Sequence, residues 1–404
     1  MSVEIASYAG AMEALRHPDL MQGLYDAGMS VMADALITLH GEAHSQRRVV
    51  EFGVFGRGFF REYERGVFAN ILQPALAPCR AAGRADLVEL GYRVTMNLTA
   101  DFAGIDRPTG DADETNRLLS LVKTFSEGAT LVHSTRDPAE VNREVAGAMA
   151  RFDEQFFRPS RARRQALVDR VAAGELPPDA LPRDVLTTLL NNTHRVQLSD
   201  AALRREIAFF LQAGAHSTAN STTHAVHEIF TWLDAHPDQR QRLLDEPLFL
   251  QRCVHESLRL HPASPVAWRK AAADLTLADQ AVADGGQVVI NLHAANRDPS
   301  VFGASADAFD PARALPPNVW PFGLTFGYGT HACLGRDLDG GVVPKANADA
   351  DNHQLGVVPL FVQALLRAGA VPLADDPPVP DANTQRNNWG RYPIRLAADE
   401  EQES

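Results

Sequence analysis

The residues best suited to chemistry lie in one glycine-rich run with a single cysteine, Phe326 to Gly335, which reads FGYGTHACLG. Cys333 can supply a thiolate, which ligates a metal well when nearby backbone N–H groups stabilise its charge without returning a proton. Gly327, Gly329 and Gly335 permit positive φ and let the backbone approach a bound group that a Cβ would block. Phe326 can keep water from the sulfur. The run therefore predicts a metal-ligating cysteine in a dry loop.

Two other interpretations of this run stay open. Cys333 could be a buried structural thiol in a turn, or the glycines could belong to a dinucleotide-binding fingerprint. The fingerprint fits poorly, because its third glycine falls at the wrong spacing and no strand-to-helix unit with a following acidic residue is evident. The run matches F-G-x-G-x-H-x-C-x-G without gaps and so resembles the cysteine loop of cytochromes P-450. That resemblance implies that Cys333 is the axial ligand of a haem iron.

A charged pair ahead of the loop agrees with this resemblance. Glu256 and Arg259 stand one helical turn apart, so carboxylate and guanidinium can form a bidentate contact. Four stretches follow in the order found in the family: 261–262, Arg269, 296–299 and 309–313. Alone the pair could be a surface salt bridge, whereas the resemblance implies that it holds the structural core.

Near the N-terminus, His44 and Arg48 stand four residues apart on one face of a predicted helix. The resemblance implies that this helix grips a haem propionate, with Arg269 and His331 as the other propionate contacts. Four donors for two carboxylates suit a buried dianion. Taken alone, His44 could equally be a surface histidine.

A long helix is predicted from the N-cap residues Ser199 and Asp200 to about His236, because no proline interrupts this stretch. It would contain about 36 residues and span roughly 54 Å. Residues 213–218, AGAHST, resemble the family's A-G-x-(D/E)-T-T segment on the distal haem face. Gly214 costs roughly 1 kcal/mol relative to alanine inside a helix, so we expect it to admit oxygen or substrate beside the backbone.

Two distal positions depart from the family, since His216 replaces the usual acid and Ser217 the usual first threonine. Histidine titrates near neutrality and serine keeps a hydroxyl, so His216, Ser217 and Thr218 could relay protons to bound oxygen. Ser217 and Thr218 could also hydrogen-bond to helix carbonyls and bend the helix. We expect oxygen activation to survive with an unusual pH profile.

The surrounding pattern predicts a mainly α fold with a minor β region (α+β), as one cytochrome P-450 domain over residues 1–404, because no repeat or linker divides the chain. Helical periodicity dominates from about 60 to 260 and ends in a further apolar helix. The predicted helical segments are Arg80–Thr99, Leu118–Phe125, Pro138–Phe157 and Val358–Ala368. Short strands are expected at Leu275–Leu277 and Gln287–Leu292, with a turn at Gly285-Gly286.

Two regions differ in length from the family pattern. The N-terminus looks shortened, since His44 comes early, and 336–353 looks like an insertion after the cysteine loop. Four residues there could imitate a metal site or form a solvated acidic loop: Asp339, Asp349, Asp351 and His353. The tail 397–404 is expected to be a frayed acidic end.

Bulk composition limits the partners. Lys and Arg number 38 against 51 Asp and Glu, giving a net charge of −13, which disfavours nucleic acid and anionic lipid. No apolar run approaches the roughly 18 residues of a membrane span, and no signal pattern opens the chain. Cys79, Cys253 and Cys333 are too few and too scattered for a disulfide framework or a zinc cluster. We expect a cytoplasmic monomer.

The resemblance implies a monooxygenase that carries haem b (iron protoporphyrin IX) and inserts one oxygen atom from O₂ into a hydrophobic small molecule. The length leaves no room for a fused reductase, so electrons from NAD(P)H would arrive through a separate ferredoxin or flavodoxin-like partner. Candidate docking charges are Arg47, Arg336 and Lys345. Family-like pocket segments are Met29–Leu39, Phe209–Gly214, Ala263–Trp268 and Asn387–Trp389, which are mostly apolar and show no obvious anchoring arginine.

Two alternatives stay open. The altered distal pair could mark a haem-thiolate enzyme that uses peroxide or rearranges its substrate without O₂. The chain could also be a non-catalytic haem-binding or sensing protein.

Overall fold

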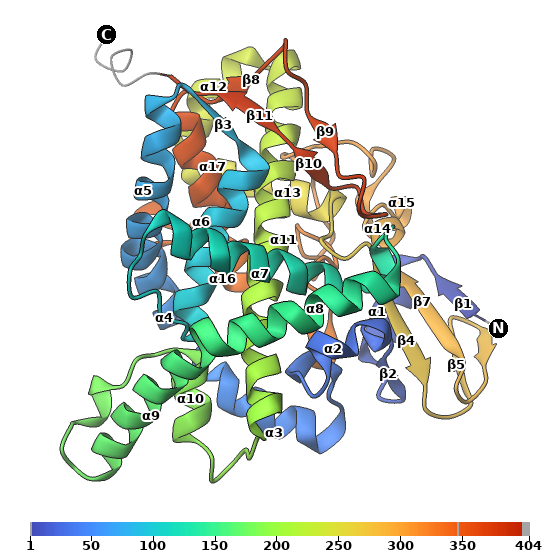
Figure 1. Cartoon of the computed structure of the whole chain (residues 1–404). Helices are drawn as coiled ribbons and strands as arrows, with labels where there is room; N and C mark the ends of the chain where they lie inside the picture. The colour runs from blue at the N-terminus through green and yellow to red at the C-terminus, as the bar shows by residue number, and fades with distance from the viewer. Residues whose placement is uncertain (1, 346, 398–404) are drawn as a thin grey trace.

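A long central helix organises the chain in a computed structural model that describes residues 2–345 and 347–397 (Figure 1). This helix, α11 (Asp200–Ala235), contains 36 residues, and the Ser199 side chain caps it by accepting a hydrogen bond from the Ala202 N–H. The predicted long helix is therefore confirmed at both ends. The part of the tail at 398–404 that was expected to fray lies outside the described residues.

Helices make up most of the described structure and surround α11. Figure 1 shows α7 and α8 crossing α11, with α9 and α10 projecting at one end. The other helices are α1 (Tyr8–Arg16), α2 (Met29–Met32), α3 (Gly41–Phe52), α4 (Arg57–Glu62), α5 (Phe68–Ala81), α6 (Leu87–Ala103), α7 (Ala112–Ala129), α8 (Pro138–Phe152), α9 (Arg158–Ala172), α10 (Val185–Asn191), α12 (Arg240–Asp245), α13 (Pro247–Leu260), α14 (Leu292–Ala295), α15 (Pro299–Phe302), α16 (Arg336–Asp339) and α17 (Val357–Arg367).

One predicted helix boundary is wrong. Arg80–Thr99 is not one helical segment, because α5 ends at Ala81 and the short strand β3 (Arg84–Asp86) precedes α6. Gly83 adopts φ +64°, which interrupts the helix, and Asp86 caps α6 by accepting a hydrogen bond from the Val88 N–H. By contrast, α8 continues through a π-helical turn at Asp153–Phe157 into α9, as the predicted Pro138–Phe157 segment required.

Short strands form the minor β region. The four-stranded sheet has the order β1-β7-β4-β2, in which β1 (Ser2–Ile5) and β7 (Gln287–Asn291) are parallel and β4 (Val266–Ala271) and β2 (Leu20–Gln22) add antiparallel. Figure 1 shows this sheet at one side of the helices, near the N-terminus. The remaining strands are β5 (Leu275–Leu277), β6 (Gln280–Val282), β8 (Val371–Pro372), β9 (Val379–Pro380), β10 (Trp389–Arg391) and β11 (Pro393–Arg395). The predicted strands and the turn at Gly285, with φ +74°, are confirmed.

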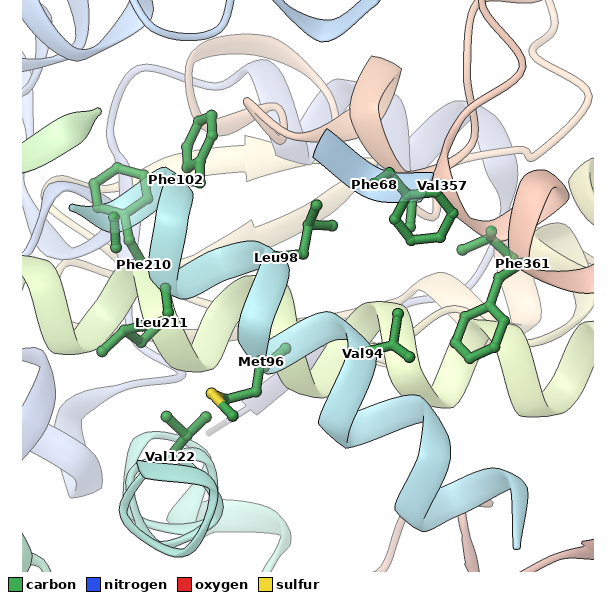
Figure 2. Close-up of a cluster of buried hydrophobic side chains, with 14 of the residues drawn as sticks. Phe68, Val94, Met96, Leu98, Phe102, Val122, Phe210, Leu211, Val357 and Phe361 are labelled. Carbon is green, nitrogen blue, oxygen red and sulfur yellow. The ribbon is translucent and has the colours of Figure 1, made fainter. Parts of the chain in front are cut away.

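The largest core lies where α6 packs along α11. Figure 2 shows α6 crossing α11, with Met96 of α6 pointing toward Val122 of α7 and with Leu98 and Phe102 on the opposite side of α6. The helices approach closely because a Cβ at Gly91 would already contact the Ala219 Cβ at 3.4 Å. This packing fixes the middle of α11, where the predicted distal residues lie.

A buried ionic cluster ties α13 to the chain that leads into the cysteine loop. The Arg259 side chain is fully buried and donates to both Glu256 carboxylate oxygens, at 2.8 Å from Nε and 2.7 Å from Nη2. Its Nη1 also donates to the carbonyls of Asn296 and Ala306, at 2.6 and 2.7 Å. Arg313 Nε adds a 3.0 Å contact to Glu256. These contacts confirm that the Glu256–Arg259 pair is a buried structural contact and not a surface salt bridge.

The segment between α16 and α17 is pinned to α13 instead of extending into solvent. Gln251 Nε2 donates to the carbonyls of Gly340 and Leu355, at 3.1 and 2.9 Å. Asp349 and Asp351 are exposed, as the acidic-loop prediction required.

Within 2–345 and 347–397, no group of three or more His, Cys, Asp or Glu residues could hold a metal ion. No helix in the same ranges is long and apolar enough to cross a membrane.

Candidate functional site

A cavity of about 340 Å³ lies between α11, α3, β4 and the cysteine loop. All of the predicted site residues line it: His44, Arg48, Gly214, His216, Ser217, Thr218, Arg269, Phe326, Gly327, His331, Cys333 and Gly335. These residues come from segments up to about 290 positions apart in the chain. The fold therefore brings the cysteine loop, the cationic residues and the distal segment of α11 to one place.

The cysteine loop closes on itself through the backbone. The Cys333 N–H donates to the Phe326 carbonyl at 2.8 Å, and Gly327 and Gly329 adopt φ +66° and +71°. A Cβ at Gly329 would lie 2.9 Å from the Leu15 carbonyl oxygen at the end of α1. Gly335 differs from the prediction, because its φ is −85°.

A Cβ at Gly335 would make only an ordinary contact, 3.9 Å from the Cys333 Sγ. Packing within the chain therefore does not require glycine at this position. Its absent side chain instead leaves room in the cavity beside the sulfur, which suits the close approach of a flat bound group.

The exposed surface of the Cys333 side chain faces this cavity. Burial by surrounding protein raises the pKa of its thiol to about 11, assisted by the charge of Asp339 and opposed by the Gly335 N–H and by Arg48. At neutral pH the free thiol would therefore stay protonated. A bound metal ion would displace that proton and hold the thiolate. Cys79 and Cys253 do not line the cavity.

Four side chains that can donate hydrogen bonds lie beside the loop: His44, Arg48, Arg269 and His331. His44 is 1% exposed and neither ring nitrogen has a hydrogen-bond partner among the described residues. Its ring centroid lies 4.4 Å from that of His331. Arg48 Nη2 donates to the Ala332 carbonyl at 2.6 Å, and Arg269 Nη1 donates to Gln22 Oε1 at 2.6 Å.

No carboxylate of the described residues forms an ion pair with any of these four donors, although buried arginines are normally paired. Burial is the main reason that the pKa of His44 falls to about 4 and that of His331 to about 3. Burial likewise lowers the pKa of Arg269 to about 10. The donors thus lack an anion, and the two propionates of a haem would fit them.

The helix that carries His44 and Arg48 is anchored to α11 by buried acids. Arg47 Nη1 contacts Glu206 Oε2 at 2.6 Å, and both side chains are buried. Glu206 also accepts hydrogen bonds from the Leu36 N–H at 3.1 Å. The prediction that Arg47 is a surface docking charge is therefore wrong, because its guanidinium is used inside the protein.

Glu51 on α3 provides a test of the buried contacts between α3 and Glu206 of α11. Burial, followed by the nearby charge of Glu206, raises the pKa of Glu51 well above its ordinary value. The folded protein therefore keeps a proton that the unfolded chain releases at its ordinary carboxyl pKa, so this group's contribution to stability is lost as pH rises above that value. We expect Glu51→Gln to gain stability relative to the natural chain as pH increases from 4.5 to 8. Urea unfolding at several pH values checks this, and a pH-independent difference would contradict it.

His216 is held between two partners in the middle of α11. Arg386 Nη1 donates to His216 Nε2 at 3.0 Å, and His216 Nδ1 contacts the Tyr92 hydroxyl. Because arginine can only donate, the neutral imidazole carries its proton on Nδ1 and donates to Tyr92. Burial, then the charges of Arg386 and His133, lower the pKa of His216 to about 3. The expectation that His216 titrates near neutrality is therefore wrong.

Ser217 and Thr218 make different hydrogen bonds. The Ser217 hydroxyl donates to the Ala213 carbonyl at 2.5 Å, as predicted. Thr218 Oγ1 instead donates to Asp339 Oδ1 at 2.6 Å. Burial raises the pKa of Asp339 to about 6, although the Thr218 bond lowers it. Asp339 is thus a half-buried acid in the cavity wall, and the prediction that places it in a solvated loop is wrong.

Gly214 has a packing role that the sequence did not reveal. A Cβ at this position would lie 2.4 Å from the Thr99 Cγ2 on α6, so any larger residue would force the two helices apart. Its proposed role in admitting oxygen or substrate stays a prediction.

Sequence reasoning missed Arg386, although it selected the neighbouring segment Asn387–Trp389. Arg386 lines the cavity, whereas Asn387, Asn388 and Trp389 do not. The four predicted segments contain no arginine, as expected, but Arg386 directly before the last of them places a guanidinium in the cavity wall. The other three predicted pocket segments each contribute to the wall, through residues such as Leu36, Phe210 and Ala263.

Comparison with known proteins points to one family. The family model "Cytochrome P450" matches residues 112–338. A cyclooctat-9-en-7-ol 5-monooxygenase of Streptomyces melanosporofaciens is 26% identical over 350 residues, which cover 78% of this chain and 71% of that protein. A biotin biosynthesis cytochrome P450 of Bacillus subtilis is 31% identical over 156 residues, which cover 39% of this chain and only 37% of that protein.

The crystal structure of CalO2 is similar to the whole arrangement. It covers 98% of this chain and 90% of its own, with a TM-score of 0.73 at 22% sequence identity. At this identity the likeness shows the fold.

Proposed function

Because the chain belongs to the cytochrome P450 family, we propose that it is a haem-thiolate monooxygenase acting on a small molecule with an apolar body. The observation that carries the proposal is the cavity in which Cys333 lies near the middle of α11 and beside four donors that form no ion pair with a described carboxylate. Electrons would come from NAD(P)H through a separate ferredoxin-type or flavodoxin-like partner. Arg336 and Lys345 stay candidate docking residues for it.

Haem b would be held by the cavity residues that have no carboxylate partner among the described residues. Cys333 would ligate the iron, and His44, Arg48, Arg269 and His331 would bind the propionates. Phe326, Gly327 and Gly335 would form the surface against the ring. When bound, the haem would supply O₂ binding and O–O cleavage, which thiolate ligation favours.

The chain's own contribution would be to orient the substrate and manage protons. The apolar wall, which includes Phe102, Phe209 and Phe210, would exclude bulk water. Since Ser217 gives its proton to the Ala213 carbonyl, its oxygen can accept a hydrogen bond from a cavity water. We assign Ser217, together with Thr218, to ordering such water. His216 would position its neighbours as a neutral ring rather than act as an acid.

The remaining expectations belong to the same proposal: one catalytic domain over 1–404, acting as a cytoplasmic monomer. An insertion after the cysteine loop is part of it. The separation of α16 from α17 by 17 residues supports the insertion, since α16 ends at Asp339 and α17 begins at Val357.

The proposal is tested with the haem-loaded protein and a substrate selected from a small-molecule library by its shift of the haem spin state. With ¹⁸O₂, NADPH, a ferredoxin and its reductase, the product should gain one ¹⁸O atom. Equal turnover with hydrogen peroxide alone would favour the peroxide-dependent alternative. Haem binding without any spin-state shift or product would favour a non-catalytic haem protein.

Ser217→Ala tests the proposed water site in the same assay. We expect a several-fold loss of product formed per NADPH oxidised and a matching rise in hydrogen peroxide, because the water loses an acceptor. Unchanged coupling in Ser217→Ala would remove Ser217 from the proton path, and unchanged coupling in His216→Ala would remove the positioning role of His216.

A further inference from the structure

Arg386 is a buried cation that forms no ion pair with any carboxylate in the described part of the chain. It lies between β9 and β10, is 9% exposed and lines the cavity. Its Nη1 donates to His216 Nε2, while its Nε has no hydrogen-bond partner among the described residues. Only Tyr25 and Tyr92 contribute favourable charge interactions, and both are phenols that are neutral at pH 7.

Three other buried arginines of the described residues do have a carboxylate partner. Arg47, Arg164 and Arg259 each pair with a carboxylate, at 2.6, 2.8 and 2.7 Å. Among the described residues, the two buried arginines without such a pair are Arg269 and Arg386, and both line the cavity. Because a buried unpaired charge is costly, a protein retains it where a ligand supplies the partner.

The surroundings of Arg386 leave it charged and available. Burial lowers its pKa to about 10, so the guanidinium stays protonated at neutral pH. Burial first, and then the charge of Arg386, lower the pKa of nearby His133 to about 4, so this ring is neutral and does not compete for an anion. His216, neutral and fixed by Tyr92, accepts from one guanidinium nitrogen and thereby orients the others.

We propose that Arg386 binds the carboxylate of the substrate, so that the substrate is an organic acid with an apolar body. The inference rests on the proposed function and names the substrate class of that site. The body would lie against the aromatic wall formed by Phe55, Phe102 and Phe210. Two carboxylate sources are conceivable, the substrate and a haem propionate. The substrate is favoured because four other donors already serve the two propionates.

The test compares acids with their primary amides, which have the same shape without the charge. Three pairs are titrated into the haem-loaded protein: 4-hexylbenzoic acid, dodecanoic acid and a fused-ring terpenoid acid, each with its amide. Calorimetry and the spin-state shift report binding. We expect at least one acid to bind tenfold or more tightly than its amide, and Arg386→Gln to abolish that preference. If no acid is preferred, or if Arg386→Gln keeps the preference, the inference is overturned.

Arg391→Gln is the matched control, because Arg391 lies on the same hairpin but is half-exposed and pairs with Asp376 at 2.5 Å. It should keep the preference for the acid. Arg269→Gln provides the comparison for the haem, since Arg269 is assigned to a propionate.

Haem content separates the two carboxylate sources. Arg386→Gln should retain haem as the natural chain does, whereas Arg269→Gln should lose part of it. Equal haem loss in the two variants would make Arg386 a propionate ligand and overturn the inference. The binding readout needs no turnover, so a preference for the acid without oxygenated product would overturn the proposed function and leave the role of Arg386 intact.

Discussion

Cys333→Ala is expected to abolish the strongly red-shifted Soret band that the reduced, CO-bound protein should show. The reason is geometric, because Cys333 is the cysteine that lines the cavity, beside the donors assigned to the propionates. With a pKa near 11 as a free thiol, its sulfur is expected to be a thiolate only when a metal ion binds it. The measurement is the difference spectrum of haem-loaded protein reduced under carbon monoxide.

Cys79→Ala is the control for that spectrum. Cys79 is only partly buried on α5, outside the cavity, and its replacement should leave the band unchanged. A band that survives in Cys333→Ala would remove the thiolate assignment. A shifted band that is absent even from the natural chain would show that Cys333 does not ligate the iron.

The cysteine loop and the Glu256–Arg259 pair could be predicted because their residues are close in sequence. The loop is closed by a backbone hydrogen bond from the Cys333 N–H to the Phe326 carbonyl, seven positions away. Glu256 and Arg259 lie one helical turn apart on α13. Local spacing of this kind determines much of the local geometry, although the negative φ of Gly335 was not predicted. The long helix α11 was predictable for the same reason, since its N-cap and its lack of proline are local features.

Contacts between distant segments could not be predicted. Arg386 meets His216 across 170 positions, and Thr218 meets Asp339 across 121. Nothing in the acidic composition of the segment after the loop indicates that Asp339 is turned inward while Asp349 faces solvent. Hydrophobic periodicity identifies the buried face of a helix but not which polar residues on it find a partner.

The same limit explains the error about histidine chemistry at position 216. An ordinary pKa near neutrality was assumed, but the value depends on burial and on the charges of Arg386 and His133, which come from other elements. Similarly, Gly214 was interpreted from its cost within one helix, although Thr99 of α6 decides its side-chain space. The residues that line the cavity were therefore predictable as a set, whereas the roles assigned to them stay predictions.

Arg259→Met is expected to cost about 3–5 kcal/mol of unfolding free energy, as the loss of one partner from a buried ion pair typically does. The substitution leaves Glu256 with only Arg313 and the Asp310 N–H as partners, and it leaves the carbonyls of Asn296 and Ala306 without their Arg259 donor in a buried site. Methionine replaces most of the aliphatic part of the arginine side chain, so little of the lost unfolding free energy should come from apolar contacts. Urea unfolding of haem-loaded protein measures it.

Arg170→Met is the matched control, because Arg170 pairs with Glu175 at 3.4 Å on the surface of α9 and both side chains are more than half exposed. Exposed pairs of this kind contribute about 0.2–1 kcal/mol, so the control should unfold close to the natural chain. Arg259→Lys separates charge from geometry: it keeps the positive charge but cannot make the two parallel bonds to Glu256, and so should fall between the other two. If Arg259→Met and Arg170→Met lost equal stability, the buried cluster would not be what joins α13 to the segment leading into the cysteine loop.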